Sequence, residues 1–494
     1  MIRASRIHPL TGKPYRAEAT QQRVRLESMP RRIAAAYDAA RTTSENQNYW
    51  ANADSLDADS ANSRGVRSVL VRRARYEVAN NGFADGIVQT LAVDIVGSGP
   101  KLRMQTPTKG FNQAVELVWS RWAKAIQFRR KLWTMAHAKV QDGESIGILR
   151  TNPKVRDRVK LDVVLIETEQ CQNPYLEVGA IGRIDGIKFD EFGNPETYYI
   201  LKQHPGGSFA VYNADPEEVD ASLILHWFAC RRAGQHRGVP EFKSTLNVGA
   251  GSRRFREATL ASAETAAEFS VLLKTLFQPD EIDAVSPMST LEVQKRMMTA
   301  LPMGWDATQM RAEHPNATYE AFLRSQLNEQ SRPKSMPYNK AACDSSSYNY
   351  ASGRLDHQTY YSQLDTDRWD CDDTVLEPLF REWWREAVSV YQWAADPNDP
   401  PLHSWQWPTH PVADINSEST ANDRKLRNGS ITLSQLYAES GQDYDDAIQE
   451  MAADYGVSED EMREILRSAI FNSQNQQASM QQAQTAADAS EATK

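Results

Sequence analysis

The sequence contains few cysteines and no long apolar run, and both shortages exclude whole classes of protein. Cys171, Cys230, Cys343 and Cys371 are far apart and form no CxxC pair. This spacing argues against a disulfide framework or a zinc site and favours a reducing compartment. No run of roughly eighteen apolar residues occurs, so we expect no transmembrane helix, and the charged first residues lack the apolar core of a secretory signal.

Sequence signatures of catalysis are also missing. The chain has no GxxxxGK[ST] loop to cradle phosphates, so we do not expect a nucleotide-driven motor. It has no GxSxG nucleophile motif, and its nine histidines form no HExxH pair. We therefore predict a protein without catalytic residues, metal ligands or cofactors.

One acidic stretch leaves an enzymatic alternative open. Five aspartates lie between positions 365 and 373, namely Asp365, Asp367, Asp370, Asp372 and Asp373. Such a cluster could hold Mg²⁺, as in a metal-dependent nuclease. However, we expect Asp372 and Asp373 to begin a helix, where carboxylates stabilise the N-terminal dipole without metal.

The net charge of −9 conceals a strong asymmetry. Residues 1–160 contain 28 Lys and Arg against 14 Asp and Glu, a surplus of +14, so the remainder carries −23. From Pro411 onwards, six basic residues face fifteen acidic ones. A subunit with such a charge distribution can present different faces to different partners, although part of each block also fits an ordinary solvated helix face.

The periodicity of apolar residues predicts an α+β protein. Residues 64–96 read as two helices separated by Asn80 and Asn81, and residues 111–138 read as one amphipathic helix. Residues 139–230 read as strands and turns, with a hairpin around Gly193-Asn194-Pro195. The Asp142-Gly143-Glu144 segment before the first strand is expected to be an exposed turn.

Two long helices flank a short irregular segment in the middle of the chain. Residues 241–277 predict a helix with an alanine-rich centre, and residues 318–335 predict a second helix that Pro333 and Pro337 terminate. Between them, residues 278–317 contain several prolines and one plausible short strand, Thr290–Lys295. A polar break, CDSSSYNYASG, follows the second helix. Further helices are expected from about Arg354 and from Asp372 or Asp373.

Three groups of residues resemble the lambda family of tailed-phage portal proteins. The first is an arginine-rich helix with an asparagine pair and a VGSG turn: Arg72, Arg73, Arg75, Asn80, Asn81, Gly97 and Gly99. The second is the Arg-Gly-Val-Pro turn at 237–240, and the third is the polar segment with Asn349, Tyr350, Ser352 and Arg354. The order helix, irregular insert, helix matches the stem, clip and stem of such a subunit.

The resemblance implies an elongated α+β subunit with a mixed α/β wing, a stem of long helices, a small α/β clip and a helical crown. The expected regions are an N-terminal arm at 1–60, wing at 61–240, inbound stem helix at 241–277, clip at 278–317, outbound stem helix at 318–335, tunnel loop with aromatic wing helices at 336–410, crown at 411–471 and a disordered tail at 472–494.

The resemblance also implies a non-enzymatic function. Such a protein forms a ring, expected to contain twelve copies, at one capsid vertex of the virion, after assembly in the bacterial host cytoplasm. The ring would nucleate capsid assembly and conduct double-stranded DNA during packaging and ejection. Its implied partners are the large terminase subunit, the major capsid and scaffold proteins and head-completion adaptors, with no membrane partner.

DNA must move through such a channel, so its contacts should be weak and sequence-blind, as phosphate contacts by Lys and Arg are. The candidate channel residues lie in or beside the polar segment: Arg332, Lys334, Lys340, Tyr350 and Arg354. Each of these cations is equally compatible with a solvated loop charge or an ion pair between subunits. The candidate terminase-facing residues of the clip are Glu292, Lys295 and Arg296.

Two other classes remain as alternatives to a portal subunit. One is the metal-dependent DNA-processing enzyme that would use the Asp365–Asp373 cluster. The other is a structural tail or neck component, against which the two long helices and their insert argue.

Overall fold

The structure is a computed structural model, and it describes residues 44–174, 182–208, 215–267, 271–275, 305–309, 316–346, 348–410, 415–439 and 444–469. The backbone divides the chain into two units, Met1–Asp57 and Ala58–Lys494. Within the first unit, Tyr49 and Trp50 meet edge to face, with ring centroids 5.9 Å apart. The predicted clip residues Glu292, Lys295 and Arg296, the strand predicted at 290–295 and the tail from 472 lie outside the described residues.

Helices near the start of the second unit contribute many residues to the main apolar core, which also includes residues between 360 and 388. The short α1 (Ala58–Ala61) precedes α2 (Arg64–Asn80) and α3 (Gly82–Val96). Asn81 separates α2 from α3, and its side chain caps α3 by accepting from the Phe83 amide. α3 carries apolar residues on most of its sides, and several of these residues are fully buried. This near-continuous hydrophobicity is typical of a helix packed on many sides.

The amphipathic segment predicted as one helix at 111–138 is two helices. α4 (Lys109–Ala125) and α5 (Phe128–Asp142) are separated at Gln127, whose φ of 55° lies in the left-handed region. Trp119 and Trp122 pack with their ring centroids 4.9 Å apart, and both are buried. Because both halves have helical periodicity, the pattern of apolar residues did not reveal the break.

All the described strands pair antiparallel. The three-stranded sheet has the order β3–β2–β8, and the four-stranded sheet has the order β4–β5–β6–β7. The bounds are β2 (Glu144–Thr151), β3 (Leu161–Ile166), β4 (Arg183–Ile184), β5 (Ile187–Phe189), β6 (Pro195–Ile200), β7 (Glu217–Asp220) and β8 (Ile224–Phe228). The hairpin predicted around Gly193 is confirmed as β5–β6. The α+β class is therefore confirmed, with helices predominating.

A long helical segment packs an aromatic cluster against α4. α9 (Tyr350–Cys371) continues through a π-helical turn, Asp372–Leu376, into α10 (Glu377–Tyr391). The helix starts expected at Arg354 and at Asp372 or Asp373 are therefore wrong. Trp383 and Phe380 of α10 lie 5.0 Å and 5.5 Å from Trp119, measured between ring centroids. The pair β1 (Lys101–Met104) and β11 (His403–Gln406) adds Trp405 to this cluster.

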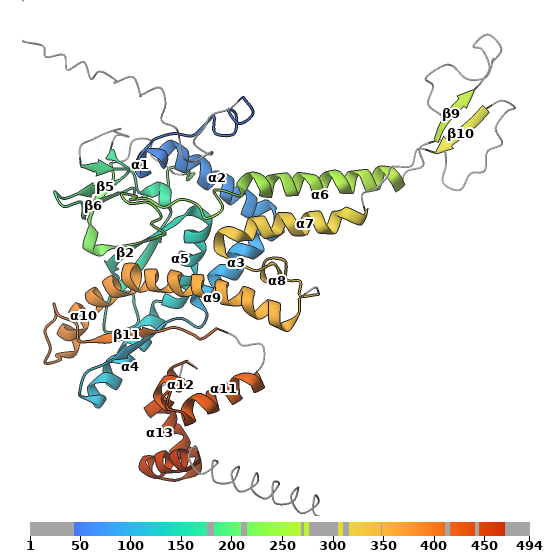
Figure 1. The fold of residues 1–494 in the computed structure, drawn as a ribbon. Helices are drawn as coiled ribbons and strands as arrows, with labels where there is room; N and C mark the ends of the chain where they lie inside the picture. Colours follow the sequence, from blue (N-terminus) through green and yellow to red (C-terminus); the bar gives the residue numbers. More distant parts are fainter. Residues whose placement is uncertain are drawn as a thin grey trace, which may run out of the picture. The chain divides into compact units, whose positions relative to one another are not determined.

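Two helices lie side by side and lead toward a two-stranded pair (Figure 1). They are α6 (Leu246–Ala267) and α7 (Asn316–Ser331), and the pair is β9 (Val271–Thr275) with β10 (Trp305–Gln309). The helix predicted over 241–277 is therefore too long, because its apolar end forms β9. The helix predicted over 318–335 is confirmed, since α7 is followed by a 3₁₀ turn, Arg332–Lys334, that contains Pro333.

The described end of the chain is helical. It contains α11 (Ile415–Arg427), α12 (Leu433–Glu439), α13 (Tyr444–Tyr455) and a further helix over 459–469. Ile448, Ala452 and Met462 form a small core of their own. Over the described parts of the chain, we find no helix with the length and apolarity that a membrane crossing requires.

Candidate functional site: the segment between α7 and α10

The candidate channel residues come from three consecutive elements. Arg332 and Lys334 lie in the 3₁₀ turn after α7, Lys340 lies in α8 (Tyr338–Ala342), and Tyr350 and Arg354 lie in the first turns of α9. The polar segment therefore ends earlier than predicted, because Asn349 caps α9 by accepting from the Ser352 amide at 2.9 Å. A short polar side chain at this position satisfies a backbone donor that would otherwise lack a partner.

Lys334 does not lie on a surface that DNA could contact. Its side chain is 3% exposed, and its ammonium group lies 2.8 Å from Glu241 and 3.5 Å from Asp367. Lys139 of α5 completes the group, 2.7 Å from Asp367. The prediction that Lys334 contacts DNA is therefore wrong for this structure. The physical reason for the burial of Lys334 is that the buried carboxylates of Glu241 and Asp367 require cations close by.

We call this buried group the four-charge cluster (Lys139, Glu241, Lys334, Asp367), and electrostatics favour the charged forms of Lys139, Glu241 and Asp367. Burial opposes ionisation, but Asp367 and Glu241 outweigh it and raise the pKa of Lys139. Burial likewise opposes the charge of Asp367 and of Glu241, yet Lys334 and Lys139 hold both carboxyl pKa values below their ordinary range. The four-charge cluster connects α5, the turn before α6, the end of α7 and α9.

Lys340 is partly exposed and already has an ionic partner. Its ammonium lies 2.8 Å from the Asp94 carboxylate of α3, which also accepts from the Tyr360 hydroxyl at 2.8 Å. Burial and the neighbouring Asp94 charge both raise the pKa of Tyr360, so its hydroxyl remains a donor. The contact fixes α8 to α3 and α9, and it neutralises part of the charge that Lys340 could offer to a phosphate.

Arg332 and Arg354 are the candidates that remain freely available. Both side chains are exposed, and neither has an ion-pair partner within the described ranges. They lie on opposite sides of α8 in the sequence, one before and one after the polar segment. The side chain of Tyr350 lies outside the described residues.

The five aspartates of the acidic stretch do not converge on one point. Asp365 pairs with His410, Asp367 belongs to the four-charge cluster, Asp370 accepts from the Trp227 indole, Asp372 accepts from the Trp407 indole, and Asp373 is exposed. A Mg²⁺ site needs several oxygens around one ion. The arrangement therefore offers no support for the nuclease alternative. Burial raises the pKa of Asp372 to about 7, and a hydrogen bond from Trp407 opposes the shift.

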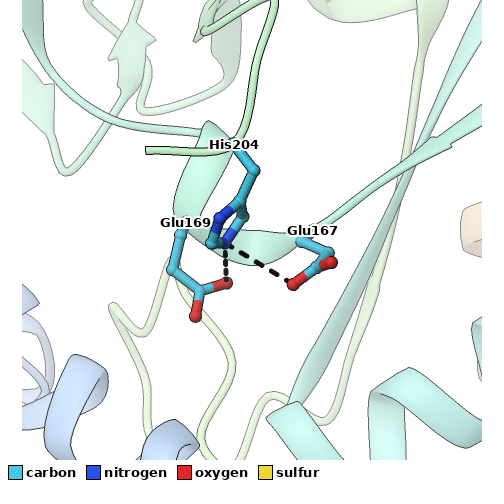
Figure 2. Close-up of side chains that lie close together, drawn as sticks. All are labelled: Glu167, Glu169 and His204. Carbon is cyan, nitrogen blue, oxygen red and sulfur yellow. Dashed lines mark ion pairs between the residues drawn. The ribbon is translucent and has the colours of Figure 1, made fainter. Parts of the chain in front are cut away.

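One group of potential metal ligands does gather elsewhere in the described structure. The ligand atoms of Glu167, Glu169 and His204 all lie within 4.8 Å of one another, and Figure 2 shows the His204 ring nitrogen directed at both carboxylates. However, the Arg75 guanidinium lies 2.9 Å from Glu167 and 3.0 Å from Glu169, and it also pairs with Asp142 at 2.7 Å. A cation therefore already pairs with both carboxylates and offsets part of their charge, and this explains structurally why an arginine stands at position 75.

The Asp142-Gly143-Glu144 segment is buried, not an exposed turn as predicted. Glu144 accepts hydrogen bonds from the Arg237 side chain, at 2.6 Å, 3.0 Å and 3.1 Å, and one from the Gly238 amide at 2.7 Å. Arg237 overcomes the cost of burial and holds the Glu144 pKa well below its usual range. Gly143 has a φ of 93°, and a Cβ there would overlap the Val239 backbone.

The Arg-Gly-Val-Pro turn therefore has a structural function. Residues 237–240 close onto the start of β2, and Arg237 also donates to the carbonyl oxygens of Thr168 and Cys171, both at 3.2 Å. Sequence reasoning identified the Arg237 motif but missed its partner Glu144, because nothing in the local pattern connects positions 93 residues apart.

The VGSG turn is also explained by a contact distant in sequence. Gly97 has a φ of 54°, and a Cβ at this position would come within 2.9 Å of the Pro408 ring. Arg368 of α9 holds the same region by donating to the carbonyl oxygens of Asp94, Ile95 and Pro408, each at 2.9–3.0 Å. The bonds to Asp94 and Ile95 satisfy carbonyl groups that the end of α3 leaves without helical partners.

Comparison with known proteins agrees with these motifs. The family model described as "Phage portal protein, lambda family" matches residues 43–368, which is more than half of the chain. A "Probable portal protein" of Halomonas phage phiHAP-1 is 21% identical over 462 residues, covering 85% of this chain and 86% of that protein.

The solved structures that contain a similar chain are less similar in sequence than this phage protein. The neck of an empty GTA particle, computed with C6 symmetry, contains a chain that is 12% identical, with a TM-score of 0.46 and coverage of 76% of this chain and 93% of that one. An HK97-family phage portal protein from Corynebacterium diphtheriae is 11% identical, with a TM-score of 0.28 and coverage of 60% of this chain and 85% of that one.

The paired long helices and the buried contacts of Arg75, Gly97 and Arg237 agree with the class of protein that the three motifs indicate. The family match then decides which kind: the chain belongs to the lambda family of phage portal proteins. It is a component of the virion at the capsid vertex and not an enzyme.

Proposed function

We propose that copies of this chain form a closed ring, expected to contain twelve subunits, through which double-stranded DNA enters and leaves the capsid. In this proposal residues 61–240 belong to the wing, α6 and α7 are the stem helices, and β9 and β10 are the base of the clip. The ring also nucleates capsid assembly and binds head-completion proteins. The large terminase subunit docks on the clip, where Glu292, Lys295 and Arg296 remain the proposed contact residues.

The observation that carries the proposal is the ionic attachment of the α6–α7 pair to the rest of the subunit. Lys334 at the end of α7 and Glu241 before α6 meet in the four-charge cluster, together with Lys139 and Asp367. A stem built in this way can transmit a force applied at its far end to the body of the subunit. Within the described residues, ion pairs and a hydrogen bond join the segment before α6 and the turn after α7 to α5 and α9.

For DNA contact we propose Arg332 and Arg354, with Lys340 and Tyr350 as further contributors. The two arginines are exposed and lack ionic partners in the described structure, so each can contact a phosphate without first breaking an ion pair. Such contacts ignore base sequence and weaken with salt, which suits a channel through which DNA must slide. Because every copy in a ring carries both residues, modest contacts would repeat around the channel.

The test begins with the purified protein, by native mass spectrometry and negative-stain imaging of one sample. A ring with a central hole is the expected result, whereas a chain that stays monomeric in the presence of capsid and scaffold proteins would refute the ring. Arg332→Ala and Arg354→Ala should then lower DNA packaging or retention several-fold at equal ring yield. Arg381→Ala, an exposed arginine of α10, is the matched control. Packaging that is equal in all four proteins would reject the two arginines as DNA contacts.

A further inference from the structure

The end of α4, the start of α5 and the loop between β2 and β3 are strongly basic. Residues 121–131 and 152–160 contain nine Lys and Arg and one acidic residue, Asp157. Six of these cations are exposed, and none of the six has an ion-pair partner in the ranges that the structure describes. We call them the basic surface: Lys124, Arg129, Arg130, Lys154, Arg156 and Arg158.

Tertiary contacts hold the two segments of the basic surface together. The Arg121 guanidinium of α4 lies 2.9 Å from the carboxylate of Asp157 in the loop. Asp157 stands between Arg156 and Arg158 in the sequence. The Trp122 indole donates to a carbonyl oxygen at the start of β3 at 2.9 Å. The loop therefore lies beside the end of α4, although Arg121 and Asp157 are 36 residues apart in the sequence.

Defined backbone holds the cations of the two helices in place. α4 and α5 meet at Gln127, whose φ is 55°. Lys124 lies in the last turn of α4, and Arg129 and Arg130 lie in the first turn of α5. A Cβ on Gly99 would lie 3.7 Å from the Arg129 side chain, so the aliphatic part of Arg129 packs along the VGSG turn. Charges on such a fixed backbone lose less conformational freedom when an anion binds.

The carboxylates that contact this region already have donors. Asp157 pairs with Arg121, Asp162 pairs with Lys131, and Glu386 accepts from the Lys160 amide. An ordinary solvated surface mixes charges of both signs, but the basic surface does not. Because like charges that stand close together repel one another and lower stability, a bound polyanion would relieve the repulsion among these cations.

The composition of the basic surface favours a nucleic acid over an acidic protein. Within residues 121–131 and 152–160, all of which the structure describes, no large apolar side chain is exposed. The exposed Leu117 of α4 is about 10 Å from Lys124 along the helix. Protein–protein contacts depend on an apolar or aromatic centre, whereas DNA-binding surfaces are wet, polar and strongly positive. Arginine supplies four of the six cations, and its two parallel N–H donors fit a phosphate group.

We infer that the basic surface binds the phosphate backbone of double-stranded DNA without sequence preference. This site is separate from the channel candidates, because Arg332 and Arg354 lie in the turn after α7 and in α9. Duplex DNA carries one negative charge per about 1.7 Å of its axis, so a short stretch of duplex offers phosphates to several of the six cations at once. The basic surface would therefore hold DNA to each subunit at a second place, and the inference requires neither the ring nor the two channel arginines.

Binding to a relaxed, closed circular plasmid tests the inference, because a circle has no end that could enter a channel. The loop variant combines Lys154→Gln, Arg156→Gln and Arg158→Gln, and the helix variant combines Lys124→Gln, Arg129→Gln and Arg130→Gln. The control removes three exposed cations near the end of the described chain: Arg424→Gln, Lys425→Gln and Arg467→Gln. Filter binding of the full chain is measured between about 50 and 200 mM NaCl, where phosphate contacts are most sensitive to salt. Circular dichroism verifies that each variant is folded.

We expect the loop variant and the helix variant each to bind the plasmid at least about tenfold more weakly than the wild type. The slope of log affinity against log salt concentration should fall in magnitude by about 2–3, because each lost phosphate contact contributes about 0.9. The control should bind within about threefold of the wild type, since the contacts of the basic surface remain. The double variant Arg332→Ala with Arg354→Ala should do the same.

The outcomes separate this site from the proposed channel. A wild type that does not bind the plasmid, or a loop variant and a helix variant that bind as the control does, would overturn the inference and leave the channel standing. A loss in the Arg332→Ala, Arg354→Ala variant equal to that in the loop variant would assign the binding to the channel arginines. Polyglutamate that displaces the plasmid at an equal concentration of charge would indicate an acidic protein and overturn DNA as the partner. A chain that forms no ring but binds the plasmid as expected would refute the ring alone.

Discussion

Replacing Lys334 with methionine should strongly destabilise the fold. Lys334 is 3% exposed on its side chain and, together with Lys139 and the partly exposed Arg231, balances the buried carboxylates of Glu241 and Asp367. Lys334→Met keeps much of the volume and removes the charge. The cations left facing the two buried carboxylates would be Lys139, 2.7 Å from Asp367 and 3.9 Å from Glu241, and the partly exposed Arg231, which pairs with Glu241. Breaking a buried ionic group by removing one partner costs about 3–5 kcal/mol of unfolding free energy.

Two further variants test whether the loss of unfolding free energy comes from the buried charge of Lys334. Arg332→Ala, two residues away on the exposed side of the same turn, should change the unfolding free energy by no more than about 0.5 kcal/mol. Asp367→Asn combined with Lys334→Met removes one charge of each sign, so the double variant should be more stable than the sum of the single effects by about 0.5–3 kcal/mol.

The assay is urea unfolding followed by tryptophan fluorescence at pH 7. Trp227 reports on this region, because the Lys139 ammonium lies 5.2 Å from the centroid of its ring. A Lys334→Met midpoint indistinguishable from that of Arg332→Ala would refute the four-charge cluster as a source of stability. It would also return Lys334 to the group of candidate DNA contacts.

The pH dependence has a definite sign. The pKa values of Asp367 and Glu241 are held below their ordinary values of 3.8 and 4.5 in the folded chain. Their stabilisation is therefore complete above those ordinary values and is lost as pH falls through the lower folded values. The pKa of Lys139 is raised above 10.5, so its contribution is lost only at strongly alkaline pH. Lys334→Met should weaken the loss of stability in acid.

Two further predictions concern other buried positions. Gly143→Ala should lower the unfolding free energy by about 3 kcal/mol or more, because a methyl group would overlap the Val239 backbone at a positive φ. Gly193 also has a positive φ, of 86°, but has open space around it, so Gly193→Ala should lower it by only about 1–2 kcal/mol in the same thermal unfolding assay. Equal losses in both would show that the close approach to Val239 is unimportant. The stability of Asp372→Asn relative to the wild type should increase as pH rises from 5 to 8. Burial raises the Asp372 pKa to about 7, so the folded wild type loses stability as this carboxyl releases its proton, and asparagine has no such proton to release. The exposed neighbour Asp373→Asn is the control, and a pH-independent difference for Asp372→Asn would contradict the assignment.

Local signals correctly predicted many elements. The end of α7 near Pro333 and the β5–β6 hairpin around Gly193 were both readable, since proline and glycine act on their own backbone. The strands β2, β3 and β8 were likewise predicted from alternation and β-branched residues. Residues 241–277 were misread because a short apolar run fits a strand and a helix equally well, and pairing with β10 decides in favour of the strand.

The candidate site was less predictable than the fold. Composition indicated that Arg332, Lys334, Lys340 and Arg354 are cations near a polar segment, but it could not distinguish buried from exposed ones. Lys334 is enclosed and Lys340 is paired, whereas Arg332 and Arg354 remain exposed. The difference depends on Glu241 and Asp94, which lie far away in the sequence.

The sequence by itself determined the family and many of the helices and strands, because motifs, periodicity and turn residues act over a few neighbouring positions. Only the tertiary structure decided which charges neutralise one another. Arg237 meets Glu144 across 93 residues, and Lys340 meets Asp94 across 246 residues. An ion pair depends on distance in space and on burial, and neither quantity is written in the local pattern of the chain. The folded chain therefore assigns Arg237 and Lys334 to its interior and leaves Arg332, Arg354, Arg130 and Arg156 on its surface.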